Sequence, residues 1–215
     1  IQKTTFKYEI PYMLLITAVL LVMGMTGNEI TFIEGVILWV LFIAYLLYLY
    51  FLAKKGNDSG DEQPVKLYPV WKYLLFIVLG GVCVVIGSQL VVNGATTIAR
   101  ACGMSERFIG LTIVAFGTSL PELVTSVSAA RKGNAGIAIG NIVGSNIFNI
   151  LFVIGTVALI CPVPFESRFV IDTVVAILCG VLLWGGTIRH KELRKPCGVV
   201  MLLCYAAYFV YLAVM

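Results

Sequence analysis

Seven apolar stretches follow one another along the 215-residue chain, and each is long enough to cross a lipid bilayer. A membrane-spanning helix needs about 20 predominantly apolar residues. The stretches run approximately over 10–27, 30–52, 72–94, 107–130, 135–160, 168–188 and 196–215. Charged residues make up only 12% of the chain and gather in short connections, and the alternating pattern of a transmembrane barrel is absent. The sequence therefore predicts an all-α polytopic membrane protein with about seven transmembrane helices.

Basic residues are unequally divided between the two sides that seven spans define. One side holds the N-terminus, the hydrophilic linker 53–71, the turn at 131–132 and the loop 189–195, and it carries twelve lysines and arginines. The other side carries three, Arg100, Arg107 and Arg168. Cytoplasmic loops are enriched in Lys and Arg, so the first side is predicted to be cytoplasmic and the C-terminus to lie outside. The basic residues form no continuous patch, and the net charge of +4 does not indicate a nucleic-acid partner.

An internal repeat relates the first two spans to the last two. A shift of 163 residues places 35–49 on 198–212 without a gap, and it aligns Glu9 with Asp172. Five spans separate the paired segments, so the two copies would have opposite orientations, as in transporters built from inverted repeats. The repeat divides the chain into 1–52, the last two helices of a first half; 53–71, a cytoplasmic linker; and 72–215, a second five-helix half. We expect the partner of the central stretch in an N-terminal part that precedes residue 1.

The central stretch, 110–152, combines apolar residues with a carboxylate. Glu122 lies near the middle of a predicted span, where an ionisable side chain is costly and usually functional. Pro121 precedes it and cannot donate a hydrogen bond to the carbonyl of Gly117. The sequence therefore predicts a broken membrane helix, which is tolerated only where protein or a polar cavity satisfies the freed backbone groups.

Oxygen-bearing side chains follow helical spacing on both spans of this stretch. Residues at steps of 4, 3 and 4 on the first span are Ala115, Ser119, Glu122 and Ser126, with Thr118 and Thr125 beside them. Residues at steps of 4 on the second are Asn141, Ser145 and Asn149, with Asn146 beside them. We expect both helices to be broken and the two polar faces to converge near the bilayer midplane, with Gly140 and Gly144 allowing a neighbouring helix to approach.

Carboxylate, hydroxyl, amide and carbonyl oxygens are hard ligands, which favour calcium, sodium or potassium over zinc or copper. One carboxylate leaves a divalent cation under-neutralised, so a symmetry-related half would supply the remaining ligands. Two other interpretations stay open. The hydroxyls could serve helix packing alone, and Asn146 could cap a broken turn.

The motifs G-T-S-L-P-E-L at 117–123 and G-N-I-V-G-S-N-I-F-N at 140–149 resemble the second α-repeat of the cation/calcium exchanger superfamily. The resemblance covers about 105–155 and is closest to prokaryotic sodium/calcium antiporters, near the potassium-dependent branch. It implies a ten-helix inverted-repeat fold in a bacterial or archaeal cell (inner) membrane, of which this chain is the C-terminal part.

The resemblance also implies roles for individual residues. Glu122 would be the carboxylate that binds calcium and sodium, Thr118 and Ser119 adjacent ligands, and Ala115 a carbonyl ligand. Ser145, Asn146 and Asn149 would contribute from the next span. Some relatives carry Asp where this chain has Asn149, which leaves the stoichiometry and any potassium dependence open. No prosthetic group is implied, and the partners are membrane lipid, the transported ions and the first half with its own α-repeat.

These observations predict a secondary active transporter that exchanges calcium for sodium by alternating access. A calcium/proton antiporter is the alternative, because burial favours the neutral form of a carboxylate and Glu122 could exchange metal for proton. A cation channel is a more remote alternative. An enzyme is not predicted, because the sole histidine, His190, lies in a charged loop away from the membrane serines.

Overall fold

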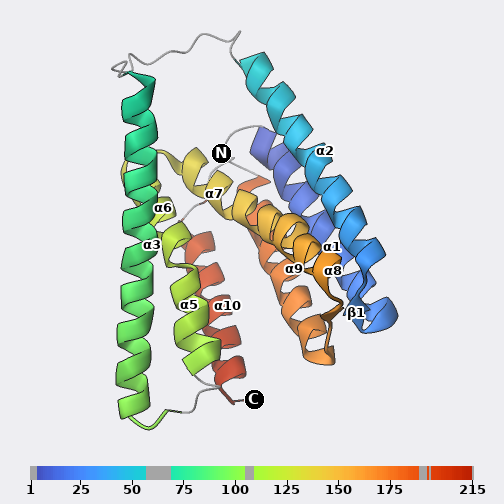
Figure 1. Cartoon of the computed structure of the whole chain (residues 1–215), viewed down its shortest axis with the longest axis vertical. Helices are drawn as coiled ribbons and strands as arrows, with labels where there is room; N and C mark the ends of the chain where they lie inside the picture. Colours follow the sequence, from blue (N-terminus) through green and yellow to red (C-terminus); the bar gives the residue numbers. More distant parts are fainter. Residues whose placement is uncertain (1–3, 57–68, 105–108, 189–192, 194, 215) are drawn as a thin grey trace. The chain divides into compact units, whose positions relative to one another are not determined.

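The computed structural model describes residues 4–56, 69–104, 109–188, 193 and 195–214, and these are almost entirely helical (Figure 1). The helices are α1 (Ile10–Gly27), α2 (Phe32–Gly56), α3 (Val70–Ala101), α5 (Ala115–Thr118), α6 (Leu120–Arg131), α7 (Ala135–Phe148), α8 (Gly155–Ile160), α9 (Ser167–Ile188) and α10 (Lys195–Val214). Three π-helical segments, Thr5–Glu9, Gly110–Val114 and Asn149–Ile154, precede α1, α5 and α8. Two short strands, β1 (Glu29–Ile30) and β2 (Val163–Pro164), pair antiparallel.

Apolar helices occupy the positions of the predicted spans. Five described segments are long and apolar enough to cross a membrane: Thr5–Gly27, Phe32–Lys54, Val70–Ala101, Ala135–Ile160 and Ser167–Ile188. A bent pair, Thr112–Thr118 with Leu120–Arg131, makes a sixth span if it is counted as one, and α10 is apolar over Lys195–Tyr211. The chain is therefore an integral membrane protein of the all-α class, as the sequence predicts.

The chain forms two compact units. The first comprises 1–60 and 133–202, and the second comprises 61–132 and 203–215. The two units are defined by which residues pack together. The predicted division at the linker 53–71 is defined by the sequence repeat, and it stays a prediction. Residues 57–68 of that linker, together with Arg107, His190 and most of the loop 189–195, lie outside the described residues.

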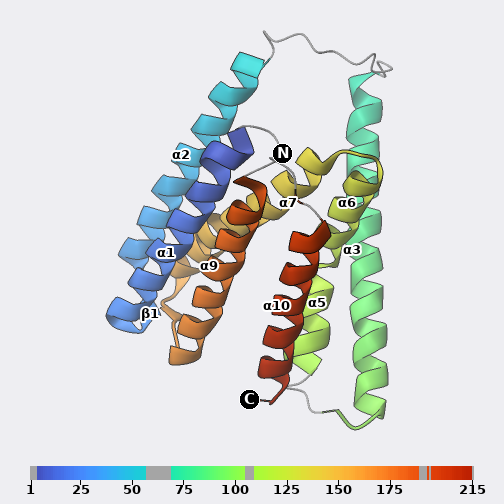
Figure 2. The same ribbon diagram turned by 180° about the vertical axis from the view of Figure 1, so that it is seen from behind.

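In the first unit, α1 packs along α9, and these are the helices that the repeat relates. The ladder of Glu29 with Pro164 and Ile30 with Val163 brings the end of α1 next to the start of α9. The two helices therefore run antiparallel, which is also visible in Figure 2. This arrangement fits an inverted repeat, because related elements must have opposite directions.

Helix α2 packs closely on α8 in the same unit because glycines face the contact. A methyl group at Gly35 would lie 2.9 Å from Cβ of Ala158, and one at Gly155 would lie 3.2 Å from Cβ of Leu38. Small residues let membrane helices approach in this way. Nearby, Nε1 of Trp39 donates a hydrogen bond of 3.2 Å to Oγ1 of Thr156. The contact fixes the end of the span that begins at Ala135.

The second unit is built on the long helix α3, which packs against the broken span. The two helices meet closely at Gly117 in α5, where an added methyl group would overlap the side chain of Val92 in α3. Any residue larger than glycine at position 117 would therefore have to displace the Val92 side chain.

Candidate ion-binding site

The membrane helix that carries Glu122 is broken one turn before the carboxylate. Helix α5 ends at Thr118, α6 begins at Leu120, and the two axes are bent by 51° around Ser119. Pro121 lies in the first turn of α6, where its missing N–H group is tolerated. The carbonyl of Gly117 has no N–H group four residues ahead of it. The predicted break is confirmed.

Glu122 lies in the first turn of α6 and is half-buried. The N-terminus of a helix carries partial positive charge from its unpaired N–H groups, which stabilises a nearby carboxylate. One turn further along, Ser126 is buried, whereas Thr118 and Ser119 are exposed at the break. Ala115 is the first residue of α5. The predicted ligands of this span therefore gather around the break and the first turns of α6.

The hydroxyl group of Thr125 is held by its own helix. Its Oγ1 donates a hydrogen bond of 2.8 Å to the carbonyl of Pro121. This bond satisfies a carbonyl near the bend, as threonine commonly does in membrane helices. Thr125 therefore has a local structural role in the second unit.

The second motif lies on a helix that is not broken. Helix α7 continues through the π-helical segment Asn149–Ile154 into α8, so that Ala135–Ile160 forms one span. The predicted break of this span is wrong, because it contains no proline and every residue keeps its N–H group. The departure from α-helical geometry starts at Asn149, and π-helical segments are frequent at functional sites.

Two side chains of the second motif donate hydrogen bonds to one backbone carbonyl. Oγ of Ser145 lies 3.0 Å from the carbonyl oxygen of Ile142, and Nδ2 of Asn146 lies 2.8 Å from it. Because the donors are used within the helix, the lone pairs of Oγ and the Oδ1 atom of the amide stay suitable for a cation. Asn146 is therefore bonded inside a continuous helix and does not cap a broken turn.

The remaining residues of this motif differ in exposure. Ser145 and Asn141 are half-buried, while Asn146 and Asn149 are exposed. A methyl group at Gly140 or Gly144 would meet no atom of the described chain within 4 Å, so the structure does not show the helix contact expected there.

The predicted ligands belong to different compact units. Ala115, Thr118, Ser119 and Glu122 are in the second unit, and Ser145, Asn146 and Asn149 are in the first. The structure brings together the members of each set, and the convergence of both sets on one cation stays a prediction.

A second carboxylate, Glu9, has no role predicted from the sequence and lies among tyrosines in the first unit. A signal was present, because Tyr8 and Tyr12 are four residues apart and Tyr45 and Tyr48 are three apart, so that each pair shares a helix face.

Comparison with known proteins places the chain in a family. Residues 72–214 match the family model for sodium/calcium exchanger proteins. The putative antiporter CaxA of Alkalimonas amylolytica is 34% identical over 97% of this chain and 68% of its own length. The sodium/calcium exchanger MaX1 of Methanosarcina acetivorans is 38% identical over 66% of this chain and 41% of its own.

Solved structures of the sodium–calcium exchanger NCX_Mj share the fold. One of them superposes with a TM-score of 0.77 at 31% identity, covering 99% of this chain and 67% of that one. The chain thus spans between about two fifths and two thirds of the length of these relatives. The matched region includes both polar motifs and most of the helices, and the chain belongs to the sodium/calcium exchanger family.

Proposed function

We propose that the protein is a secondary active transporter that exchanges calcium for sodium by alternating access, with Glu122 as the central ion-binding carboxylate. The observation that carries this proposal is the position of Glu122 at the break between α5 and α6, inside a membrane span. A carboxylate at such a place is costly unless it binds a cation or proton. The exchangers MaX1 and NCX_Mj are named for sodium and calcium, which supports these ions as substrates.

The ligands in the proposal are hard oxygens. Thr118, Ser119 and the backbone carbonyl of Ala115 would act beside Glu122, and Ser145, Asn146 and Asn149 would add hydroxyl and amide oxygens. Calcium takes 6–8 oxygen ligands, and a single carboxylate neutralises half of its charge. We expect the remaining charge from a first α-repeat outside this sequence. Potassium as a further ion is open, since the chain has Asn149 where an acidic ligand would add charge.

Alternating access requires an element with two positions that ion occupancy biases. Helix α3 is the candidate, because it packs directly on the broken span through Val92 and Gly117. Occupation of the site by sodium or by calcium would favour the conformations that open it to one side. The cytoplasmic side would be the one with twelve basic residues, and the C-terminus would lie outside.

The test uses the full protein that contains this chain, reconstituted in proteoliposomes. We expect calcium-45 uptake that depends on a sodium gradient and falls at least about 100-fold in Glu122→Gln, since loss of even an outer-shell metal partner costs 10–100-fold. Glu29→Gln is the matched control, because it removes an exposed carboxylate in β1, just after α1, and this variant should transport normally.

The same preparation distinguishes the alternatives. Uptake driven by a proton gradient and indifferent to sodium would assign calcium/proton exchange. A flux far above transporter rates would indicate a channel. If calcium does not move under either gradient, the exchanger proposal is wrong.

A further inference from the structure

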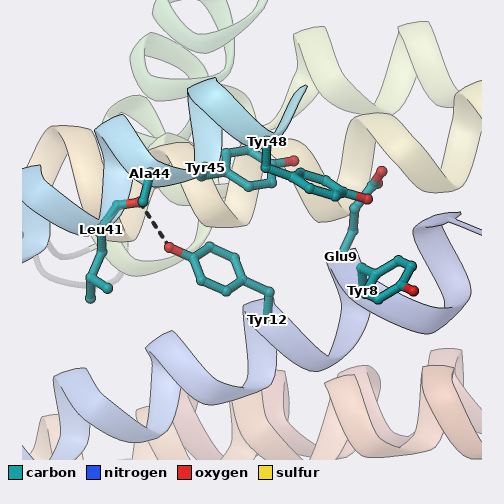
Figure 3. A pocket seen from close by; sticks show the side chains of 7 residues that line it. All are labelled: Tyr8, Glu9, Tyr12, Leu41, Ala44, Tyr45 and Tyr48. Atoms are coloured by element: carbon teal, nitrogen blue, oxygen red, sulfur yellow. Dashed lines mark hydrogen bonds between the residues drawn. The ribbon is translucent and has the colours of Figure 1, made fainter. Parts of the chain in front are cut away.

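A pocket in the first unit combines a carboxylate with four tyrosines. It has a volume of about 290 Å³ and lies between the N-terminal end of the first span and the C-terminal half of α2. Its polar residues are Tyr8, Glu9, Tyr12, Tyr45 and Tyr48, and Figure 3 shows Glu9 extending from its helix toward the tyrosines of α2. None of these residues belongs to the proposed calcium site, so this pocket requires its own explanation.

Glu9 carries a buried carboxylate. The residue is 9% exposed, and it has neither a hydrogen bond nor an ion pair among the residues that the structure describes. The nearest lysine in sequence, Lys7, places its ammonium group over the ring of Tyr8, 5.4 Å from the ring centroid. A buried charge is costly unless it is paired, so a carboxylate in this position favours a cationic ligand.

The tyrosines form a box of aromatic rings beside this carboxylate. Tyr45 stacks on Tyr12 with 5.5 Å between ring centroids, and Tyr48 lies 6.2 Å from Tyr45 and 6.2 Å from Tyr8. The hydroxyl group of Tyr12 donates a hydrogen bond of 2.9 Å to the carbonyl of Leu41, which fixes its ring (Figure 3). Aromatic faces attract ammonium groups, so the ring faces that are not stacked on one another favour an organic cation.

One hydroxyl group of the box is available to a ligand. Oη of Tyr48 is buried and has no hydrogen-bond partner in the part of the chain that the structure describes. A primary ammonium group has three N–H donors, and Tyr48 and Glu9 supply acceptors for them. A metal ion fits less well, since calcium takes 6–8 oxygen ligands and this box is mainly apolar ring surface.

The position of the pocket in the membrane indicates where the ammonium comes from. Glu9 lies in the first turns of the span Thr5–Gly27, and Tyr45 and Tyr48 lie toward the end of the span Phe32–Lys54. The short connection at β1 makes these helices antiparallel, so both ends reach the same membrane surface (Figure 1). Tyrosines are typical of this level, where lipid headgroups lie. We propose that the pocket binds the primary ammonium headgroup of a zwitterionic phospholipid, with Glu9 as its counter-ion.

The experiment measures lipid binding to the purified full protein by native mass spectrometry. The probes are phosphatidylethanolamine and phosphatidylglycerol with identical acyl chains. We expect phosphatidylethanolamine to be retained preferentially, and its affinity to fall about tenfold in Glu9→Gln. Ala44→Phe fills the pocket without removing a charge and should have the same effect. The control Glu29→Gln removes an exposed carboxylate at the other end of α1 and should bind as the parent does.

Three results would overturn the proposal. The first is equal retention of both lipids. The second is unchanged phosphatidylethanolamine binding in folded Glu9→Gln and Ala44→Phe. The third is full displacement of the lipid by millimolar free ethanolamine, which would assign the pocket to a soluble amine. All three results are independent of calcium flux, so failure here leaves the exchanger proposal untouched.

Discussion

The two polar motifs lie in helices that differ in how they leave regular α-helical geometry. The helix with Glu122 stops at Thr118 and restarts at Leu120 with a bend of 51°. The helix with Ser145 runs without interruption from Ala135 to Ile160 and contains a π-helical segment from Asn149. The first motif contains a proline and the second does not. Glycine and amide residues alone therefore do not break a membrane helix in this chain.

This difference separates two ways of presenting oxygen atoms to an ion. At the break, Pro121 leaves the carbonyl of Gly117 without an N–H group four residues ahead, and the start of α6 favours a carboxylate. In the continuous helix, Ser145 and Asn146 both donate to the backbone carbonyl of Ile142, which leaves their own side-chain oxygen atoms for an ion. We infer that the first motif provides charge and carbonyls, and the second provides hydroxyl and amide oxygens.

After the loss expected for Glu122→Gln, the largest effect is expected from Pro121→Ala. Alanine restores an N–H group that can bond the carbonyl of Gly117, which straightens the helix and moves the proposed ligands Thr118 and Ser119 relative to Glu122. Sodium-driven calcium uptake should fall about tenfold, equivalent to about 1.4 kcal/mol. The measurement is calcium-45 uptake into proteoliposomes at matched protein density.

Pro11→Ala is the matched control, because Pro11 also lies in the first turn of its helix but the span Thr5–Gly27 continues through it. Its uptake should stay within about twofold of the parent protein. An equal loss in both variants would show that proline acts through general helix stability, and the proposed role of the break would be wrong.

Residue patterns were sufficient to predict the membrane class, the positions of the helices and the break at Pro121. Each depends on a local property, such as the length of an apolar run or a missing N–H group. The repeat also predicted that α1 and α9 are related, and their antiparallel packing agrees with it. The continuous second helix differs from the predicted broken one, because glycine and asparagine weaken a helix but keep the N–H group that proline lacks.

The next smaller effect is a change in stability, which we expect to have opposite signs for alanine at Gly117 and at Gly144. A methyl group at Gly117 overlaps Val92, whereas one at Gly144 meets no described atom within 4 Å. Gly117→Ala should lower the stability by about 1–3 kcal/mol through overpacking. Gly144→Ala should raise it by about 0.4–1 kcal/mol, because alanine restricts the unfolded chain. Thermal unfolding in detergent measures both changes.

Stability changes of opposite sign in Gly117→Ala and Gly144→Ala would establish that only the first motif depends on close helix contact. If Gly144→Ala destabilises as strongly as Gly117→Ala, the helix approach predicted from the sequence at Gly140 and Gly144 exists after all. This distinction could not be made from sequence, since both glycines have the same spacing relative to their polar residues and differ only in the neighbour opposite them.

The aromatic pocket at Glu9 also could not be predicted from the sequence. Its parts come from two helices, and Tyr12 donates a hydrogen bond to the carbonyl of Leu41, 29 residues further along the chain. Tyrosines near the ends of membrane helices are expected at any lipid interface, so their spacing alone does not indicate a binding site. Burial of the carboxylate, which the residue pattern alone does not show, distinguishes this group from an ordinary aromatic belt.

The smallest expected effect concerns charge at the start of the π-helical segment. Asn149→Asp adds a carboxylate to the motif that otherwise offers neutral oxygens, and it should lower the half-saturating calcium concentration about threefold, a change of about 0.65 kcal/mol. Asn134→Asp adds the same charge at the exposed start of α7 and should leave that concentration unchanged. Equal shifts in both variants would mean that calcium responds to surface charge in general. A lower half-saturating calcium concentration in Asn149→Asp alone would show that a neutral motif on a continuous helix still contributes to ion binding. It would also show that the amide of Asn149 keeps the calcium affinity below the level that this helix can support.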